Sequence, residues 1–162
     1  MRLKQSFGVT HINPGTTLVL SELKYVLDYS RKFYAFDIIP MGAVRMSSSD
    51  RWKTNPHHID PDKRQREVVT RYFAYKDILR AQAQQMNYEL GEHLDIVFFC
   101  PMPDSWSDNK KNKMNGLPCK VKPDTDNMVK AIKDTLRKQD SDIWYEKAQK
   151  HWAYRGSILI YK

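Results

Sequence analysis

The sequence predicts a single domain of the α/β (α+β) class, in which strands and helices alternate along the chain. Its 162 residues are the length of one domain, and two complete domains are not expected in a chain of this size. Apolar residues make up 41% of the chain and charged residues 28%, which is a globular composition rather than a disordered one. The apolar residues recur in the order strand, loop, helix, strand, loop, helix, strand, and this order indicates one layered domain.

The first two thirds of the chain predict two strands and a helix. Apolar residues alternate along Phe33–Pro40, so a strand is expected there. Apolar residues at roughly helical spacing predict a helix over Tyr72–Leu90, and Gly91 is expected to stop it. The apolar run Leu94–Met102 predicts a second strand. Residues 17–27 fit either a short amphipathic helix or part of a strand.

The last third of the chain predicts a helix and a strand. Apolar residues four positions apart predict a helix over Asp124–Lys138. A turn is expected over Gln139–Asp142, and the mixed pattern of residues 143–156 assigns no element. The apolar segment Ser157–Tyr161 predicts the final strand.

Charge and composition exclude several classes of protein. The formal net charge is +8, which favours a polyanionic partner, and nucleic acid is the usual one. No apolar run approaches the ~18–20 residues of a membrane-spanning helix, and no secretory signal is visible, so no membrane partner is expected. The two cysteines, Cys100 and Cys119, lack a Cys-x-x-Cys spacing, so a reduced, cytoplasmic protein is predicted. A disulfide between them is the less favoured alternative.

Much of the positive charge lies in two polar segments that are expected to be surface loops. Residues 45–71 contain seven basic and four acidic residues, and residues 104–122 contain five basic and two acidic ones. Each segment therefore has a net charge of +3, and lysine and arginine in such segments neutralise DNA phosphates. The residues expected to contact DNA are Arg45, Lys53, Lys110, Lys111, Lys113, Lys120 and Lys122.

Two aspartates, Asp124 and Asp126, lie where the second loop meets the last predicted helix. Pro123 disfavours helical geometry at the residue before it, and residues two apart in an extended stretch point the same way. Both carboxylates can therefore converge on one Mg²⁺ ion, which prefers oxygen ligands. Lys130 is one helical turn past Asp126 and can face the same space. Acidic residues also cap helix N-termini, so this pattern alone leaves both interpretations open.

A longer pattern of acids, lysine and tryptophan surrounds the two aspartates. The helix start Asp124-Thr-Asp-Asn127 is followed along the helix by Lys130 and Asp134, and Trp144-Tyr-Glu-Lys-Ala-Gln149 follows after the turn. This arrangement resembles the signature of RusA-type Holliday-junction resolvases, in which Asp-x-Asp-Asn is followed by Lys, Asp and then Trp-x-Asp-Asp-x-Gln. Pro40–Arg45 and the prolines after the second strand are also similar to that family. The resemblance covers about residues 34–160.

The resemblance implies a fold, an activity and an assembly. The expected fold is a mixed β-sheet flanked by helices in a nuclease domain over residues 34–162, with residues 1–33 as an N-terminal extension of unassigned role. The implied activity is a Mg²⁺-dependent endonuclease, with Mn²⁺ as the alternative cation. It would hydrolyse phosphodiester bonds at four-way junctions or other branched DNA in recombination and repair. Such a protein would act as a homodimer in a bacterial cell, with a phage or prophage as a further source of the gene.

The resemblance also assigns site residues, with one departure. By position, Asp124 and Asp126 would bind the metal, and Lys130 would contact a phosphate or stabilise the leaving oxygen. The family uses the second of its paired acids as a ligand, but Lys147 stands at that place, and Glu146 matches the first acid. Either Glu146 takes the ligand role through its longer side chain, which we favour, or catalysis is weakened or lost. Extended backbone would put these two residues on opposite faces.

Two further functions stay open. The departure at Lys147 motivates a junction-binding protein on the same fold that has lost catalysis, and metal-dependent nicking of a four-way junction would separate it from a nuclease. A nucleotide-sugar transferase could also use Asp-x-Asp to hold a metal. It is disfavoured because 162 residues is short for such an enzyme and a charge of +8 is not needed for its reaction.

Overall fold

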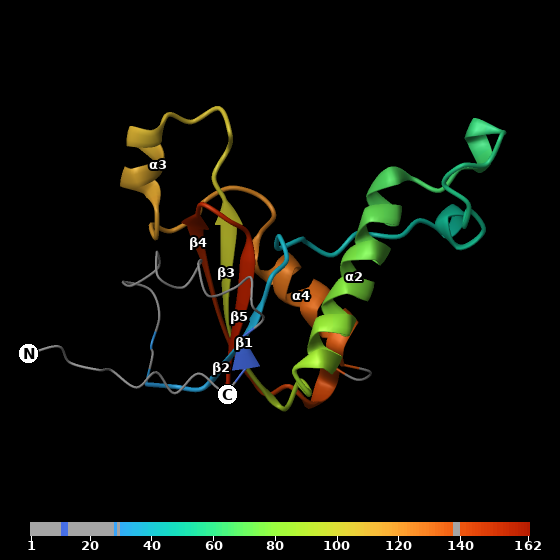
Figure 1. The fold of residues 1–162 in the computed structure, drawn as a ribbon. Coiled ribbons are helices and arrows are strands. Elements are labelled where there is room, and N and C mark those ends of the chain that lie inside the picture. Colours follow the sequence, from blue (N-terminus) through green and yellow to red (C-terminus); the bar gives the residue numbers. More distant parts are fainter. Residues whose placement is uncertain (1–10, 13–27, 29, 138–139) are drawn as a thin grey trace, which may run out of the picture.

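The computed structural model of the protein describes residues 11–12, 28, 30–137 and 140–162. Strands form one mixed sheet, and the two longer helices lie together on one face of it (Figure 1). This architecture confirms the predicted α/β (α+β) class. The helix or strand expected over residues 17–27 lies outside the described residues. Within the described part of the chain, no helix has both the length and the apolar character needed to cross a membrane.

The sheet has five strands in the order β1-β2-β5-β3-β4. β5 pairs antiparallel with β2 and β3, whereas β3 and β4 are parallel, as are β1 and β2. The short strand β1 comes from the segment expected to be an N-terminal extension, and it pairs with β2. The strands are β1 (His11–Ile12), β2 (Phe33–Phe36), β3 (His93–Pro101), β4 (Tyr145–Ala153) and β5 (Ser157–Tyr161).

Three α-helices are described: α2 (Glu67–Gln85), α3 (Asp108–Met114) and α4 (Thr125–Leu136). The main core lies between the sheet and the helix pair α2–α4, where Leu79, Phe98 and Ile132 have no exposed surface. Burying an apolar side chain of this size contributes about 1.5–3 kcal/mol. Arg80 Nε of α2 donates to the carbonyl of Thr135 at 3.3 Å and ties the C-terminal parts of both helices together. The core therefore fixes the position of α4 on the sheet.

Strand β4 was absent from the elements predicted for residues 143–156. It pairs in parallel with the whole of β3 but is an edge strand. Its first three residues, Tyr145–Lys147, are exposed, and burial begins only at Trp152 and Ala153. Because both faces of its first half meet solvent, the alternation of apolar and polar residues that signals a strand is missing.

The segments predicted as loops contain helical turns, which their polar sequences did not indicate. α3 lies within the predicted loop 104–122 and buries none of its seven residues, so it has no apolar face to signal it. α2 begins at Glu67, five residues before the predicted start, and ends at Gln85 rather than Leu90. Residues 45–71 contain two 3-10 turns, Ser48–Arg51 and Pro61–Lys63.

The segment before α2 is fastened to the start of that helix by a charged pair. Arg66 donates to Asp50 at 2.5 and 3.0 Å, and it also donates to the carbonyl of Arg45 at 3.0 Å. The Asp50 carboxylate accepts further bonds from the backbone and hydroxyl of Ser47. In Figure 1 this segment extends past the N-terminus of α2, away from the sheet. The pair therefore fixes the backbone at Arg45, one of the residues predicted to contact DNA.

We expect the order of this segment to depend on pH through Asp50. Hydrogen bonds from Arg66 and Ser47 hold the pKa of Asp50 well below its ordinary value. Because the folded pKa lies below the unfolded value of about 3.9, the stabilisation is present above about pH 4 and lost as the pH falls towards the folded pKa. Hydrogen exchange, corrected for its intrinsic pH dependence, should show protected amides near Ser47 from pH 5 to 8 and weaker protection at pH 3. Asp50→Asn should lose that protection already at pH 7.

The matched control is Asp62→Asn, which changes an exposed acid in the same segment that forms no ion pair with another described residue. Equal protection in Asp50→Asn and Asp62→Asn would show that the charged pair does not hold the segment.

Candidate active site

The N-terminus of α4 presents three charged side chains that have no partner among the described residues. Asp124 occupies the N-cap position, but its carboxylate accepts no hydrogen bond from the helix. Asp126 follows in the first turn and Lys130 one turn later, and both are exposed. The side chains of these three residues form no hydrogen bond or ion pair with any other described residue. Capping therefore does not occupy the Asp124 carboxylate.

A second sequence segment packs directly against this helix start. The amide of Ala43 donates to the carbonyl of Asn127 at 3.0 Å. Beside it, buried Gly42 lies so close to α4 that an added Cβ would be 2.6 Å from Asn127 Nδ2 and 2.9 Å from Pro123 Cβ. Pro40–Arg45 was singled out from the sequence, but its contact with the aspartate helix was not predicted. The structure shows that glycine is needed there for close approach.

Gly42→Ala is predicted to damage the site through this contact. Overpacking of this kind costs about 1–3 kcal/mol in stability, and a displacement of about 1 Å in an active site can reduce a rate about a hundredfold. We expect a lower urea midpoint and, for the endonuclease activity that the sequence resemblance implies, a rate reduced at least about tenfold. Gly91→Ala is the matched control, because an added Cβ there would meet no atom within 4 Å. Normal cleavage by Gly42→Ala would show that the approach to Asn127 does not position the site.

Strand β4 also supports the segment that leads into α4. Lys150 donates from Nζ to the carbonyls of Val121 and Pro123, at 2.5 and 2.7 Å. Its own carbonyl accepts from the amide of Cys119 at 2.9 Å. Sequence patterns gave no reason to select Lys150, because the strand that carries it was not predicted. The lysine holds the backbone immediately before Asp124 and is therefore a positioning residue.

Glu146, the expected third ligand, lies beside a different part of α4. Its carboxylate forms an ion pair with Lys133 Nζ at 2.9 Å. Lys133 is seven residues past Asp126, about 10 Å along the helix axis. Among the described residues, no three acids, histidines or cysteines lie close enough together to hold a metal ion. The structure thus places Asp124 and Asp126 at the start of α4, and Glu146 of β4 beside a later turn of the same helix.

The register of β4 places Glu146 and Lys147 on opposite faces of the sheet. Glu146 pairs with Leu94, which faces the core beneath the helices, and Lys147 pairs with Asp95. Asp95 is buried on the other face, where Arg31 binds its carboxylate at 2.5 Å. Lys147 is therefore directed away from α4, which agrees with the alternation expected from the sequence.

The predicted DNA-contacting residues lie on both sides of the α4 N-terminus. α3 carries Lys110, Lys111 and Lys113, and Lys120 and Lys122 follow in the segment leading to Asp124. Lys53 and Lys111 are half-buried, and the other five residues predicted to contact DNA are exposed. Figure 1 shows α3 on one side of α4, and the segment with Arg45 and Lys53 on the other. Two basic surfaces therefore flank the two aspartates.

The donor set at the α4 N-terminus suits a divalent cation. Mg²⁺ is usually held by one or two carboxylates together with water and substrate phosphates. Asp124 and Asp126 supply two carboxylates that no described residue neutralises. Flanking lysines can neutralise DNA phosphates on either side of that point. The arrangement fits a cation that receives the rest of its ligands from water and a nucleic acid.

The comparisons with known proteins agree with this geometry. Residues 39–160, which are more than half of the chain, match the family model described as Endodeoxyribonuclease RusA. The matched range includes Gly42, the whole of α4, and β4 with Glu146 and Lys150. Comparison with curated proteins and with solved structures found no match.

Proposed function

Because the chain belongs to the RusA family of endodeoxyribonucleases, we propose that it uses a divalent cation to cut four-way DNA junctions. Membership makes the chain an endodeoxyribonuclease of the Holliday-junction resolvase type, so its reaction is hydrolysis of a DNA phosphodiester bond. Mg²⁺ is the proposed cation, with Mn²⁺ as the alternative. Recombination and repair are its proposed setting, and residues 34–162 are the proposed nuclease domain.

The Asp124 carboxylate carries this proposal. It stands at a helix N-cap, where an acid would ordinarily accept hydrogen bonds from the first turn, yet it accepts none. The Asp126 carboxylate likewise forms no hydrogen bond or ion pair with a described residue. A divalent cation bound by these two side chains would polarise the phosphoryl group and lower the pKa of a bound water. Both aspartates would hold it, and Lys150 and Gly42 would keep the helix start in place.

Lys130 and the flanking lysines act on the DNA itself in this proposal. Lys130 is one turn past Asp126 on the exposed side of α4, so its ammonium can contact the phosphate next to the cation. A positive charge there stabilises negative charge that develops on the phosphate or on the leaving oxygen. The lysines of α3 and of the following segment neutralise phosphates further along the strands.

A homodimer completes the proposal, because resolving a four-way junction requires cuts on two opposing strands. The described residues of one chain place the two candidate aspartates at a single helix start, and a two-fold pair of identical sites supplies two such centres by symmetry. Light scattering at micromolar protein should give twice the mass of the chain. A monomeric mass, both free and on junction DNA, would contradict the dimer.

A synthetic four-way junction and a duplex of matched sequence test the function directly. We expect paired nicks in the junction with Mg²⁺, no nicks without it, and little cutting of the duplex. Equal cutting of both DNAs would contradict structure selectivity, and unchanged cutting in a chelator would contradict the cation.

A second candidate is a junction-binding protein whose catalysis is weakened. Lys147 occupies the position of a family ligand, and Glu146 is held by Lys133. In the same assay this candidate predicts a shifted junction band in a native gel without nicks in Mg²⁺ or Mn²⁺. Nicking of the junction in the presence of a divalent cation therefore separates the two candidate functions.

DNA binding is predicted to depend strongly on salt and to persist without metal, because the lysines are separate from the aspartates. Each phosphate contact adds about 0.9 to the slope of log affinity against log salt. Replacing Lys110, Lys111 and Lys113 by alanine should lower that slope by up to about 2.7 if each contacts one phosphate, without changing which strand is cut. Fluorescence anisotropy from dilute to physiological salt measures this.

The control replaces Lys32 and Lys162, which lie together at the opposite end of the sheet from α3 (Figure 1). It removes positive charge without touching the proposed DNA surface. A slope near zero in the parent, or the same loss of slope in both variants, would contradict the assignment of α3.

A further inference from the structure

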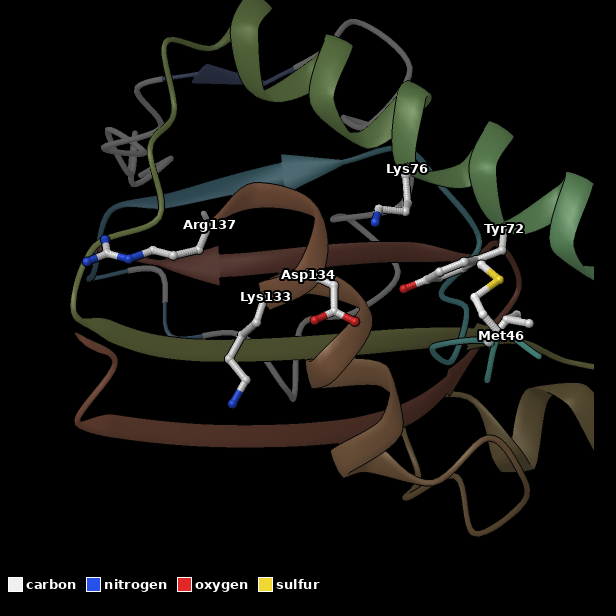
Figure 2. Close-up of a pocket in the computed structure, with 7 residues that line it drawn as sticks. Met46, Tyr72, Lys76, Lys133, Asp134 and Arg137 are labelled. Atoms are coloured by element: carbon white, nitrogen blue, oxygen red, sulfur yellow. The ribbon is translucent and has the colours of Figure 1, made fainter. Parts of the chain in front are cut away.

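A cavity of 370 Å³ lies between α2 and the C-terminal half of α4 (Figure 2). Its volume falls at the lower end of the range for small-molecule sites. α2 contributes Tyr72 and Lys76, α4 contributes Lys133, Asp134 and Arg137, and Met46 lines it from the segment before α2. The wall is therefore mainly charged, with one aromatic ring and an apolar patch.

Among the three cations that line this cavity, Lys76 is the one that no described acid neutralises. Lys133 is paired with Glu146 at 2.9 Å and Arg137 with Asp142 at 3.0 Å. Lys76 forms no ion pair with a described residue. Its ammonium lies 5.5 Å from the centroid of the Tyr72 ring, and Figure 2 shows it directed from α2 into the space before α4. An anionic group entering the cavity would meet this charge.

The Tyr72 hydroxyl is buried in the same wall and has no hydrogen-bond partner among the described residues. The residue as a whole is only 3% exposed. Burial, reinforced by the nearby Asp134 carboxylate, raises the pKa of Tyr72, so the hydroxyl keeps its proton at neutral pH. Figure 2 shows the hydroxyl pointing towards the side of the cavity where Asp134 lies. Buried polar groups are nearly always satisfied, so the Tyr72 hydroxyl indicates a missing polar partner.

The cavity is in line with the proposed active site. Asp126, Lys130 and Asp134 follow one another at intervals of four residues, so they lie on one side of α4. The first and last are about 12 Å apart along the helix axis. A DNA strand rises about 3.4 Å per nucleotide in a duplex. A strand with a phosphate beside Asp126 therefore reaches the cavity within about four nucleotides.

We propose that the cavity holds one unpaired nucleotide of the DNA strand, with its phosphate at Lys76 and its base hydrogen-bonded by Tyr72 and Asp134. The ionised Asp134 carboxylate can only accept hydrogen bonds. It therefore favours a base with an exocyclic amino group, which presents two N–H donors, over unpaired thymine, which presents one imino N–H between two carbonyl acceptors. This inference rests on the proposed function, because it requires a DNA strand along α4.

Single-stranded oligothymidine, with and without one central 2-aminopurine, tests the cavity without a junction, a metal or cleavage. The fluorescent base carries an amino group. We expect the parent to bind the 2-aminopurine strand more tightly than the all-thymine strand. Loss of one hydrogen bond should reduce affinity about three- to tenfold. Tyr72→Phe and Asp134→Asn should therefore lower affinity for the 2-aminopurine strand by that factor and remove the preference.

Lys76→Gln should weaken binding of both strands and lower the salt slope by about 0.7, the value for one phosphate contact of a single strand. The matched control is Arg71→Gln, which removes a positive charge from the same helix beside Tyr72, where the exposed side chain pairs with Glu67. Tyr72→Phe removes a hydroxyl without a described partner, so its urea midpoint should be unchanged or higher.

Binding of both strands by the three cavity variants as tightly as by the parent would overturn the cavity proposal, as would failure of the parent to bind single strands at all. Neither result bears on cutting of the four-way junction, which is measured separately. Conversely, an inactive parent that shows the predicted strand preference would overturn the proposed nuclease reaction and leave the nucleotide site standing.

Discussion

Replacing Asp126 by Asn is expected to lower the rate of junction cleavage at least about a hundredfold while junction binding stays intact or becomes tighter. Asparagine keeps the shape of the side chain but removes the charge that would hold the cation. A bound metal contributes several kcal/mol to transition-state stabilisation, and each 1.36 kcal/mol is a factor of ten in rate. Binding improves or is unchanged because a negative charge near the DNA phosphates is lost. Single-turnover cleavage and gel shifts without divalent metal measure the two quantities.

Asp124→Ala separates a metal ligand from a helix cap. Loss of a capping side chain typically costs about 1 kcal/mol of stability. Since the Asp124 carboxylate accepts no hydrogen bond from α4, we expect a smaller loss of unfolding free energy together with a loss of cleavage as large as in Asp126→Asn. Weaker binding of Mn²⁺ by calorimetry should accompany it.

The control is Glu67→Gln, which neutralises an acid in the first turn of α2, where the exposed side chain faces Arg71. It should cut as the parent does. If Asp124→Ala loses stability but still cuts, the carboxylate is a cap and the metal must be bound elsewhere.

The parts of the fold that could be predicted are those with an apolar pattern. β3 and β5 lie in the middle of the sheet, so their residues are almost all buried, and both were predicted to within one residue at each end. α4 places its apolar residues on the sheet and its charged residues outside, and its start was predicted to within one residue. β4 and α3 carry no such pattern, because each meets solvent over most of its surface.

The same distinction holds for the site. Asp124, Asp126 and Lys130 could be predicted to lie together, because their spacing along one helix is a local property of the sequence, and none of the three pairs with another described residue. Gly42 and Lys150 act through contacts with segments about 80 and 30 residues away. Such contacts depend on the order of strands and on the face that each residue takes, which local patterns do not contain. The ion pair between Glu146 and Lys133 could not be predicted for the same reason, because it depends on the register of β4.

Glu146→Gln is expected to abolish junction cleavage while junction binding is kept, if Glu146 leaves Lys133 to complete the metal site. A third carboxylate would close the coordination shell left open by Asp124 and Asp126. Lys133 competes for that carboxylate, since the two groups are paired at 2.9 Å. Long helical side chains lean towards the helix N-terminus, so we expect Lys133 to hold the Glu146 carboxylate on the side that faces the aspartates. Lys133→Gln should therefore keep cleavage and lower the Mn²⁺ concentration needed for half-maximal rate.

Lys147→Ala is the matched control, because Lys147 is the next residue of β4 but faces the opposite side of the sheet. It should cut nearly as well as the parent. An exposed ion pair contributes about 0.2–1 kcal/mol, so a purely structural role predicts small, equal losses of stability in Glu146→Gln and Lys133→Gln. If both variants show only such losses and cut normally, Glu146 is not a ligand. The reaction would then depend on the two aspartates of α4 with water and DNA phosphates completing the shell.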